Sequence, residues 1–337
     1  MTDYLEPLRC PLCGGALAAD GGSLRCGAGH VYDLARAGYV NLLPPGKKNN
    51  AKTGDEREMI RARSEFLRRG FYDPIASAVA AAVAGASFAG APFAGAPFAG
   101  APFAGASFAR RTESGTGTGA EDAPFRIADL GAGEGYHTCR TAALLADLLG
   151  RGVDAFGFDA SKAGAEAGCR LAKSLGFLPK EGIAAPPGAW TSPVRAAVLP
   201  ANIFRLPFAD RAADAALSLF APVPWAEAVR ILVPGGRLAV VSAGRDHLAE
   251  LRAVLYEEVR RTDFHPAPPE ECGGLSLLGR RTFSFPAALT SREEIDALFR
   301  MTPFYHRTGD AGRARLGALD SLAVTAEIEL SLWEAAS

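Results

Sequence analysis

Short apolar runs alternate with helical periodicity along the second half of the chain. The runs that predict strands are residues 125–130, 153–159, 196–201, 212–220 and 236–243. Candidate helices fill the intervals and begin near Tyr136, Ser161, Pro224 and His247. This order predicts an α/β fold with a doubly wound, parallel, Rossmann-like sheet. Apolar and polar residues alternate over 321–333, which predicts a final strand with one more solvated face.

Two segments rich in Pro and Gly interrupt this pattern. A five-residue unit, GASFA or GAPFA, repeats over residues 85–109. Its period is too short for a solenoid unit, which takes roughly 20 to 50 residues. Because Gly and Pro recur in the repeats, we predict a flexible, low-complexity insertion over residues 85–122. Residues 178–193 form a second such patch, which is predicted to loop out.

The composition is that of an ordinary soluble chain. Of the 337 residues, 48% are hydrophobic and 22% are charged, and the formal net charge is −1. This charge gives no global attraction to nucleic acid or acidic membranes, so any nucleic-acid contact must be local. The sequence shows neither a secretory signal nor an apolar run of the roughly 18 residues that a membrane helix needs. We therefore expect a cytoplasmic protein without membrane contact.

Three cysteines and a histidine cluster near the start of the chain. Cys10-x2-Cys13 and then Cys26-x3-His30 supply four ligands in two close pairs, as a tetrahedral zinc ion requires. Since protein ligands fill all four positions, no place is left for water, and we expect structural rather than catalytic Zn2+. A disulfide framework is not expected, because the other cysteines stand apart, at Cys139, Cys169 and Cys272.

These features divide the chain into four parts. We predict a zinc-binding module over 1–45, a basic helical connector over 46–84, the insertion over 85–122 and a larger α/β domain over 123–337. The basic residues considered as phosphate contacts are Lys47, Lys48, Lys52, Arg57 and Arg61. Charge alone favours the alternative, a solvated helix face balanced by nearby acidic residues.

A glycine-rich loop follows the first strand of the predicted sheet. Its sequence DLGAGEG places Gly131, Gly133, Glu134 and Gly135 before a helix, where glycines let a ligand approach the backbone. The next strand ends in Asp159, at a distance where a carboxylate reaches both hydroxyls of a ribose. Glu134 would repel a dinucleotide pyrophosphate but suits a cationic sulfonium and ammonium. We therefore infer S-adenosyl-L-methionine (SAM) as the cofactor.

The core resembles a class I SAM-dependent methyltransferase. This resemblance rests on the DLGAGEG loop, on Asp159, on RLPFADRAADAALS and on RILVPGGRLAVVS. The segments CPLCGGAL, CGAGHVYDLARAGYVNLLP, GDEREMIRARSEFLRRGFYDPI, GRDHLAELRAVLYEEV and MTPFYHR resemble the RlmA family of 23S rRNA guanine-N1 methyltransferases. The match covers nearly the whole chain outside the two low-complexity segments. It implies a zinc-binding RNA-recognition module joined to a SAM-dependent methyltransferase domain.

The resemblance also implies residues for each site. Zinc would be bound by Cys10, Cys13, Cys26 and His30. SAM would be held by Tyr72 of GFYDP, by the loop carrying Glu134 and Gly135, and by His247 of GRDHL. The residues themselves add Gly131, Gly133 and Asp159, with Asn202 as a further candidate near the adenine. Without the resemblance, Tyr72 would be interpreted as a core aromatic residue and His247 as a helix-opening residue.

The implied substrate is a guanine in a hairpin loop of 23S rRNA near the macrolide-binding exit tunnel. Such a base must be splayed out before methylation at N1. The segment FAPVP follows the fourth strand, where related enzymes contact the flipped base, and its candidate contacts are Phe220, Ala221 and Pro222. Phe220 would stack on the base, and the Ala221 carbonyl would accept from its exocyclic amine. The alternative is that the prolines of this segment only end the strand.

Two other functions stay open at this point. One is a SAM-dependent small-molecule methyltransferase in which the zinc module only aids folding or dimerisation. The other is a noncatalytic RNA- or protein-binding module, against which the intact glycine loop and Asp159 argue. The sequence also leaves open a homodimer, an effect on macrolide resistance, and how the insertion affects the presentation of Tyr72.

Overall fold

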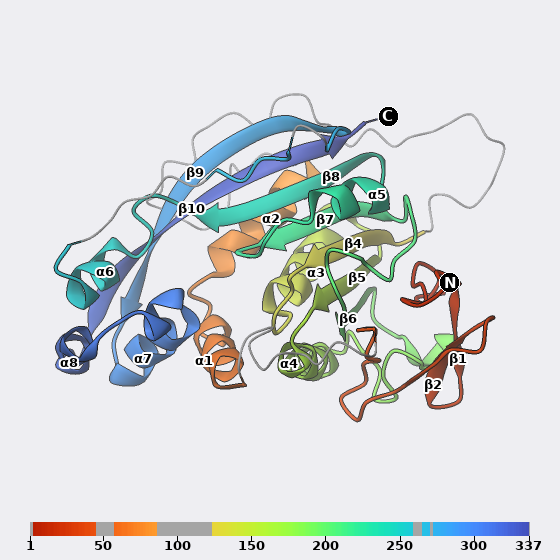
Figure 1. Ribbon diagram of the computed structural model, residues 1–337, viewed down its shortest axis with the longest axis horizontal. Coiled ribbons are helices and arrows are strands. Elements are labelled where there is room, and N and C mark those ends of the chain that lie inside the picture. Colours follow the sequence, from red (N-terminus) through yellow and green to blue (C-terminus); the bar gives the residue numbers. More distant parts are fainter. Residues whose placement is uncertain (1–2, 45–56, 86–122, 259–264, 270–271, 337) are drawn as a thin grey trace.

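A seven-stranded sheet forms the centre of the protein, which is described here by a computed structural model (Figure 1). The structure describes residues 3–44, 57–85, 123–258, 265–269 and 272–336. The strand order is β6-β5-β4-β7-β8-β10-β9. The parallel strands are β4 (Phe125–Leu130), β5 (Val153–Asp159), β6 (Val194–Pro200), β7 (Ala213–Leu219) and β8 (Leu232–Ala243). The predicted α/β fold and its five parallel strands are therefore confirmed.

Helices follow the strands as the doubly wound pattern requires. They are α1 (Arg57–Arg68), α2 (Asp73–Ala84), α3 (Tyr136–Leu149), α4 (Lys162–Ser174), α5 (Trp225–Ile231), α6 (Ala249–Leu255), α7 (Arg292–Met301) and α8 (Asp310–Gly317), with short 3-10 turns at Pro187–Ala189 and Pro303–His306. Ser161 caps α4, because its hydroxyl accepts from the Gly164 amide at 3.1 Å. In Figure 1, α6, α7 and α8 gather at one end of β9 and β10, away from the N-terminal module.

The C-terminal strands differ from the prediction. β10 (Leu322–Ala335) is antiparallel to both β8 and the edge strand β9 (Leu275–Leu289). The expected solvated face is wrong for its second half, where residues 328–333 are all buried, including Glu329. This carboxylate is matched by the Arg280 guanidinium at 3.1 Å and the His265 ring at 2.6 Å. β9 itself was not predicted, because Gly279, Arg280 and Arg281 break its apolar pattern.

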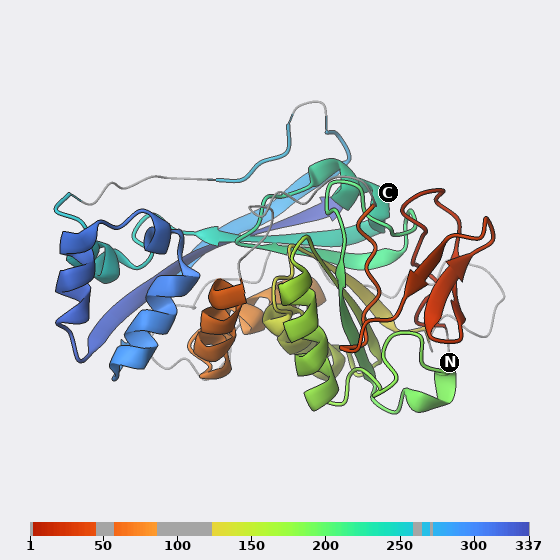
Figure 2. The same cartoon turned by 60° about the horizontal axis from the view of Figure 1, so that its bottom comes forward.

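The N-terminal module is a small antiparallel sheet that docks on the edge of the large one. Its strands are β1 (Leu17–Asp20), β2 (Ser23–Cys26) and β3 (Val31–Asp33). The Tyr4 ring stacks on Phe156 at 4.4 Å, and its hydroxyl donates to the Ala155 carbonyl at 2.6 Å. Leu8 pairs with Phe208, and the Leu42 amide donates to the Pro200 carbonyl at 2.8 Å. Figure 2 shows the module beside β6.

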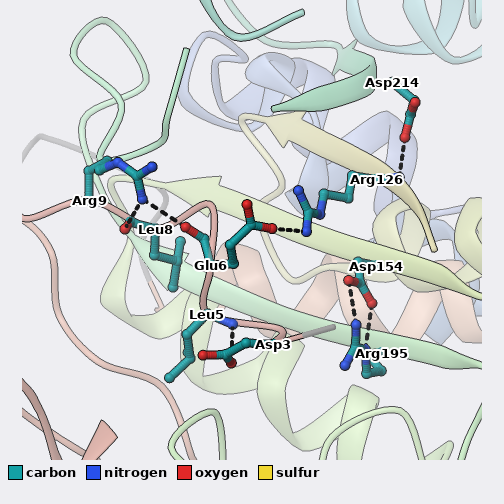
Figure 3. A network of polar contacts seen from close by, with 9 residues as sticks. All are labelled: Asp3, Leu5, Glu6, Leu8, Arg9, Arg126, Asp154, Arg195 and Asp214. Carbon is teal, nitrogen blue, oxygen red and sulfur yellow. Dashed lines mark hydrogen bonds and ion pairs between the residues drawn. The ribbon is translucent and has the colours of Figure 1, made fainter. Parts of the chain in front are cut away.

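Charged side chains form ion pairs at this junction (Figure 3). Glu6 of the module forms an ion pair with Arg126 of β4. Asp154 of β5 accepts two hydrogen bonds from Arg195 of β6, both at 2.6 Å. The Arg195 guanidinium also lies 5.4 Å from the Tyr4 ring centroid. A buried pair of this kind needs such close partners, since each charge has lost its water.

The prediction that residues 178–193 loop out is wrong. Ile183 and Trp190 are buried, and the Trp190 ring lies 4.6 Å from that of Tyr4. The Ile183 amide donates to the Gly38 carbonyl at 2.9 Å. The N-terminal module therefore covers this segment and supplies the apolar partners that Pro and Gly content alone does not reveal.

Several predictions fall outside the described residues. They concern the repeats, almost all of the insertion over 85–122, and the lysines Lys47, Lys48 and Lys52. In the part that the structure describes, the connector consists of α1 and α2, which pack on α7 and α3, respectively. No helix among the described residues is long and apolar enough to span a membrane.

Candidate active site

The glycine loop lies at the carboxyl end of β4 and is shaped for close approach of a ligand. Gly131, Gly133 and Gly135 all have positive φ angles, of 99°, 54° and 72°. A Cβ at Gly131 would come within 2.4 Å of the Ala221 Cβ, and one at Gly135 within 2.6 Å of the Val198 Cγ2. Larger residues are therefore excluded by both conformation and space.

Asp159 closes the next strand and holds this loop in place. Its carboxylate accepts from the Gly133 amide at 2.9 Å and from the Ser161 amide at 2.7 Å. The Ala201 amide donates to the Asp159 carbonyl, which brings the exposed Asn202 to the same edge of the sheet. The Asn202 side chain accepts from the Phe204 amide at 3.0 Å. The structure thus gathers the predicted ribose and adenine candidates at one edge of the sheet.

A second carboxylate lies beneath the loop. Asp129 is 2% exposed, and one of its oxygens accepts from the Thr138 hydroxyl at 2.6 Å. Burial raises the pKa of Asp129 to about 7, against the effect of the Thr138 hydrogen bond and with a further contribution from Asp159. The other carboxylate oxygen is buried without a hydrogen-bond partner in the described residues. Asp129 was not among the predicted cofactor residues, although DLGAGEG begins with it.

Tyr72 and His247 come together from distant parts of the sequence. Tyr72 immediately precedes α2 and is 4% exposed, whereas His247 follows β8. The Tyr72 hydroxyl lies 3.4 Å from His247 Nε2, and His247 Nδ1 lies 2.9 Å from the Glu327 carbonyl. A carbonyl only accepts, so Nδ1 carries the proton and Nε2 accepts from Tyr72. Burial lowers the pKa of His247 to about 4, which keeps the ring neutral at neutral pH.

Phe220 completes an aromatic group at the end of β7. Its ring centroid lies 6.4 Å from that of Tyr72 and 6.1 Å from that of His247. Its φ of 54° is unusual for a residue with a side chain, and 45% of its surface is exposed. The Ala221 carbonyl accepts from the Ser218 hydroxyl at 3.4 Å, while Pro222 is exposed. The segment therefore presents an aromatic face next to the residues predicted for SAM.

The four predicted zinc ligands meet in the N-terminal module. The ligand atoms of Cys10, Cys13, Cys26 and His30 all lie within 4.8 Å of one another. The sulfurs of Cys13 and Cys26 are 3.6 Å apart, close to the roughly 3.8 Å edge of a tetrahedron with Zn–S bonds of 2.3 Å. Burial opposes ionisation of Cys10, but the Tyr32 hydroxyl at 3.0 Å and backbone amides outweigh it, so its pKa falls to about 6. This donor set fits a closed structural zinc site.

Two arginines of the basic connector face carboxylates of the protein. The Arg69 guanidinium lies 2.5 Å from Glu294 of α7, and Arg63 Nη1 lies 3.5 Å from Glu134 of the glycine loop. Part of the positive charge of the connector is therefore paired with acidic residues of the protein itself. Arg57 and Arg61 are exposed on the same helix.

Comparisons with known proteins agree with this geometry. The RlmA N-terminal zinc-ribbon family matches residues 8–51. A relative from Micromonospora griseorubida is 33% identical over 98% of this chain and 98% of its own, and one from Bacillus subtilis is 29% identical over 96% and 95%. Both bear the name "putative 23S rRNA (guanine-N(1)-)-methyltransferase". The chain belongs to this RlmA family.

A third relative of the RlmA family is the 23S rRNA (guanine(748)-N(1))-methyltransferase of Streptomyces fradiae. It is 34% identical over 72% of this chain and 66% of its own length. The RlmA-family enzyme described here is thus a SAM-dependent methyltransferase with an N-terminal zinc ribbon. The tight glycine cradle and the carboxylates around it fit that cofactor, which carries two positive charges and a ribose.

Proposed function

We propose that this enzyme methylates N1 of a guanine in a hairpin loop of 23S rRNA, near the macrolide-binding exit tunnel. The observation that carries the proposal is the meeting of Tyr72, His247 and Phe220 beside the glycine loop in a chain whose relatives align over nearly its full length. Relatives named for the same reaction support the RNA substrate and a cytoplasmic location with the ribosomal RNA.

SAM, when bound, supplies an activated methyl group with a good leaving group. The protein then has to position the acceptor and exclude water. We assign the cofactor to Tyr72, His247, Asp159, Asn202 and the glycine loop. The neutral His247 ring, fixed by the Glu327 carbonyl, holds the Tyr72 hydroxyl in one orientation.

Phe220 is the proposed platform for the flipped guanine. An aromatic ring with 45% of its surface exposed suits base stacking, which contributes about 1–3 kcal/mol per base. The Ala221 carbonyl has two lone pairs, of which Ser218 uses one, so the second is available to an exocyclic amine. Pro222 lies on the exposed side of the same segment.

The zinc module is proposed to bind the RNA. Defined contacts join it to the large domain, since Tyr4, Leu8 and Leu42 each form a hydrogen bond or a β-bridge with that domain. Leu42 contacts Pro200, two residues before Asn202, so the module ends beside the proposed cofactor edge. RNA held by the module would thus lie next to the catalytic domain.

The test is incubation with labelled SAM and unmethylated large-subunit RNA, followed by mapping of the methylated nucleotide. We expect one N1-methylguanine, and the position after which the Streptomyces fradiae relative is named is the first to inspect. Phe220→Ala should lower kcat/KM for RNA by about 10- to 100-fold with unchanged SAM affinity, whereas Phe220→Tyr should retain most activity. Transfer only to small molecules would contradict the proposal.

A further inference from the structure

Arg63 lies directly over the glycine loop. It belongs to α1, whose Ile60, Phe66 and Leu67 are buried and fix the helix on the domain. Arg63 Nη1 lies 3.5 Å from Glu134 Oε2. A Cβ added at Gly133 would come within 3.2 Å of the same nitrogen. The guanidinium therefore faces the backbone of the loop that we assign to SAM.

The charges of SAM explain why a cation at this place is significant. SAM carries a sulfonium, an ammonium and an α-carboxylate. The predicted cofactor residues include the acids Glu134 and Asp159, which suit the positive groups and the ribose, but they include no cation. Arg63 brings a permanent positive charge to the same loop. It thus matches the one group of the cofactor that the other residues leave without a counter-charge.

The Arg63 guanidinium suits recognition of a carboxylate. It has five N–H donors in a fixed fork, whose geometry matches the two oxygens of a carboxylate. About a quarter of the Arg63 side chain, 24%, is exposed, against 5% for Glu134. The arginine side chain is therefore partly buried. In such a position a charge-assisted hydrogen bond is stronger than at an open surface.

The neighbouring histidine does not compete for the anion. Burial, and secondly the charge of Arg63, lower the pKa of His137 to about 4, so His137 is neutral at neutral pH. At neutral pH the positive charge of this pair of neighbours is therefore carried by Arg63 and not by His137.

We propose that Arg63 binds the α-carboxylate of SAM, with Glu134 holding its guanidinium over Gly133. The inference rests on the proposed function only for the identity of the cofactor. It concerns recognition of an amino-acid carboxylate and does not depend on which RNA is methylated.

Calorimetry with three ligands tests the proposal on the full-length protein. SAM and S-adenosylhomocysteine both carry the carboxylate, whereas decarboxylated SAM lacks it. We expect Arg63→Gln to weaken binding of the first two by about tenfold or more and to change binding of the third by less than about twofold. Arg63→Lys should fall between, because a point charge replaces the fork. Arg68→Gln, an exposed residue of the same helix, is the matched control and should change none of them.

The possible outcomes distinguish failure of the proposed role of Arg63 from failure of the proposed RNA substrate. Equal weakening of all three ligands by Arg63→Gln would show a structural role and overturn the proposal, as would no weakening of any. Binding of decarboxylated SAM to the variant shows in the same experiment that it is folded. If wild-type protein shows the expected ligand pattern but methylates no RNA, the proposed substrate is wrong and the role of Arg63 stands. If wild-type protein binds none of the ligands, both are overturned.

Discussion

Tyr72 and His247 are 175 positions apart in the sequence, yet the tyrosine hydroxyl lies 3.4 Å from His247 Nε2. The contact joins the start of α2 to the segment after β8. Beside it, the Tyr136 hydroxyl donates to Asp73, which joins α2 to the first turn of α3 and thus to the glycine loop. The aromatic group and the loop are therefore parts of one connected structure.

Loss of the Tyr72 hydroxyl should affect the cofactor more than the fold. Tyr72→Phe keeps the buried ring, so we expect an unfolding free energy lower by only about 1 kcal/mol. SAM affinity, measured by calorimetry, should fall several-fold because His247 loses its partner. Tyr256→Phe removes a hydroxyl that accepts from Thr308 and is the control that should retain affinity. An unchanged SAM affinity in Tyr72→Phe would show that the Tyr72 hydroxyl has no part in binding the cofactor.

His247 should make the protein less stable in mild acid. An unfolded histidine titrates near 6.5, whereas burial lowers the pKa of His247 to about 4. Between these values the unfolded chain binds a proton that the folded chain does not, so the unfolding free energy falls as pH falls from 6.5 to 4. At about 1.4 kcal/mol per unit, this group contributes a loss of about 2–3 kcal/mol.

Urea unfolding at several pH values measures this effect. His247→Gln should reduce the slope of unfolding free energy against pH across that window, with the contribution of His137 remaining, and His306→Gln, an exposed histidine, should leave the slope as in wild type. An unchanged slope in His247→Gln would show that His247 is protonated alike in both states.

The parts that could be predicted from sequence are those that local pattern encodes. Parallel strands buried on both faces read as apolar runs, so β4 and β5 were predicted with their bounds. The zinc ligands and the glycine loop are likewise contiguous motifs. β9 was not predicted, because an edge strand that contains Gly279, Arg280 and Arg281 has no clear alternation of apolar and polar residues.

The sequence could not predict contacts between residues that lie far apart in the chain. Arg63 is one of several charges on an exposed-looking helix, and only the structure brings it to Glu134. Ile183 and Trp190 stand in a segment with loop composition and are buried by a module far earlier in the chain. Composition indicates whether a segment tends to form a loop, but it does not indicate which other part of the protein packs over that loop.

Gly131→Ala should destroy the cofactor cradle. At φ 99° the new Cβ would come within 2.4 Å of the Ala221 Cβ, so the loop or the FAPVP segment must move. We expect SAM binding to be lost by calorimetry. Gly150→Ala has a similar positive φ, 62°, but meets no atom within 4 Å, so it should cost only about 1–2 kcal/mol and leave binding intact. Equal effects of the two variants would point to strain alone.

Removal of zinc should loosen the module from the large domain. Chelation leaves the thiolates of Cys10, Cys13 and Cys26 without the ion that holds them together, and small zinc modules fold only with metal. We expect a lower Tm and a red shift of tryptophan fluorescence, because Trp190 packs against Tyr4 of the module. Cys13→Ser should reproduce the change, whereas Cys272→Ser should not. Fluorescence indifferent to chelation would contradict this coupling.

Shortening the repeat insertion should leave SAM binding unchanged. The insertion follows Gly85 at the end of α2, which has 12 residues and therefore places that end about 18 Å along the helix from Tyr72. It returns before Phe125, at the start of the six-residue β4, about 20 Å along the strand from the glycine loop. Arg237 also fixes the end of α2, since its guanidinium donates to the Val83 carbonyl at 2.7 Å. Deletion of residues 90–109 should therefore preserve SAM affinity by calorimetry and kcat with RNA, and a loss of affinity equal to that of Tyr72→Ala would show that the insertion positions Tyr72.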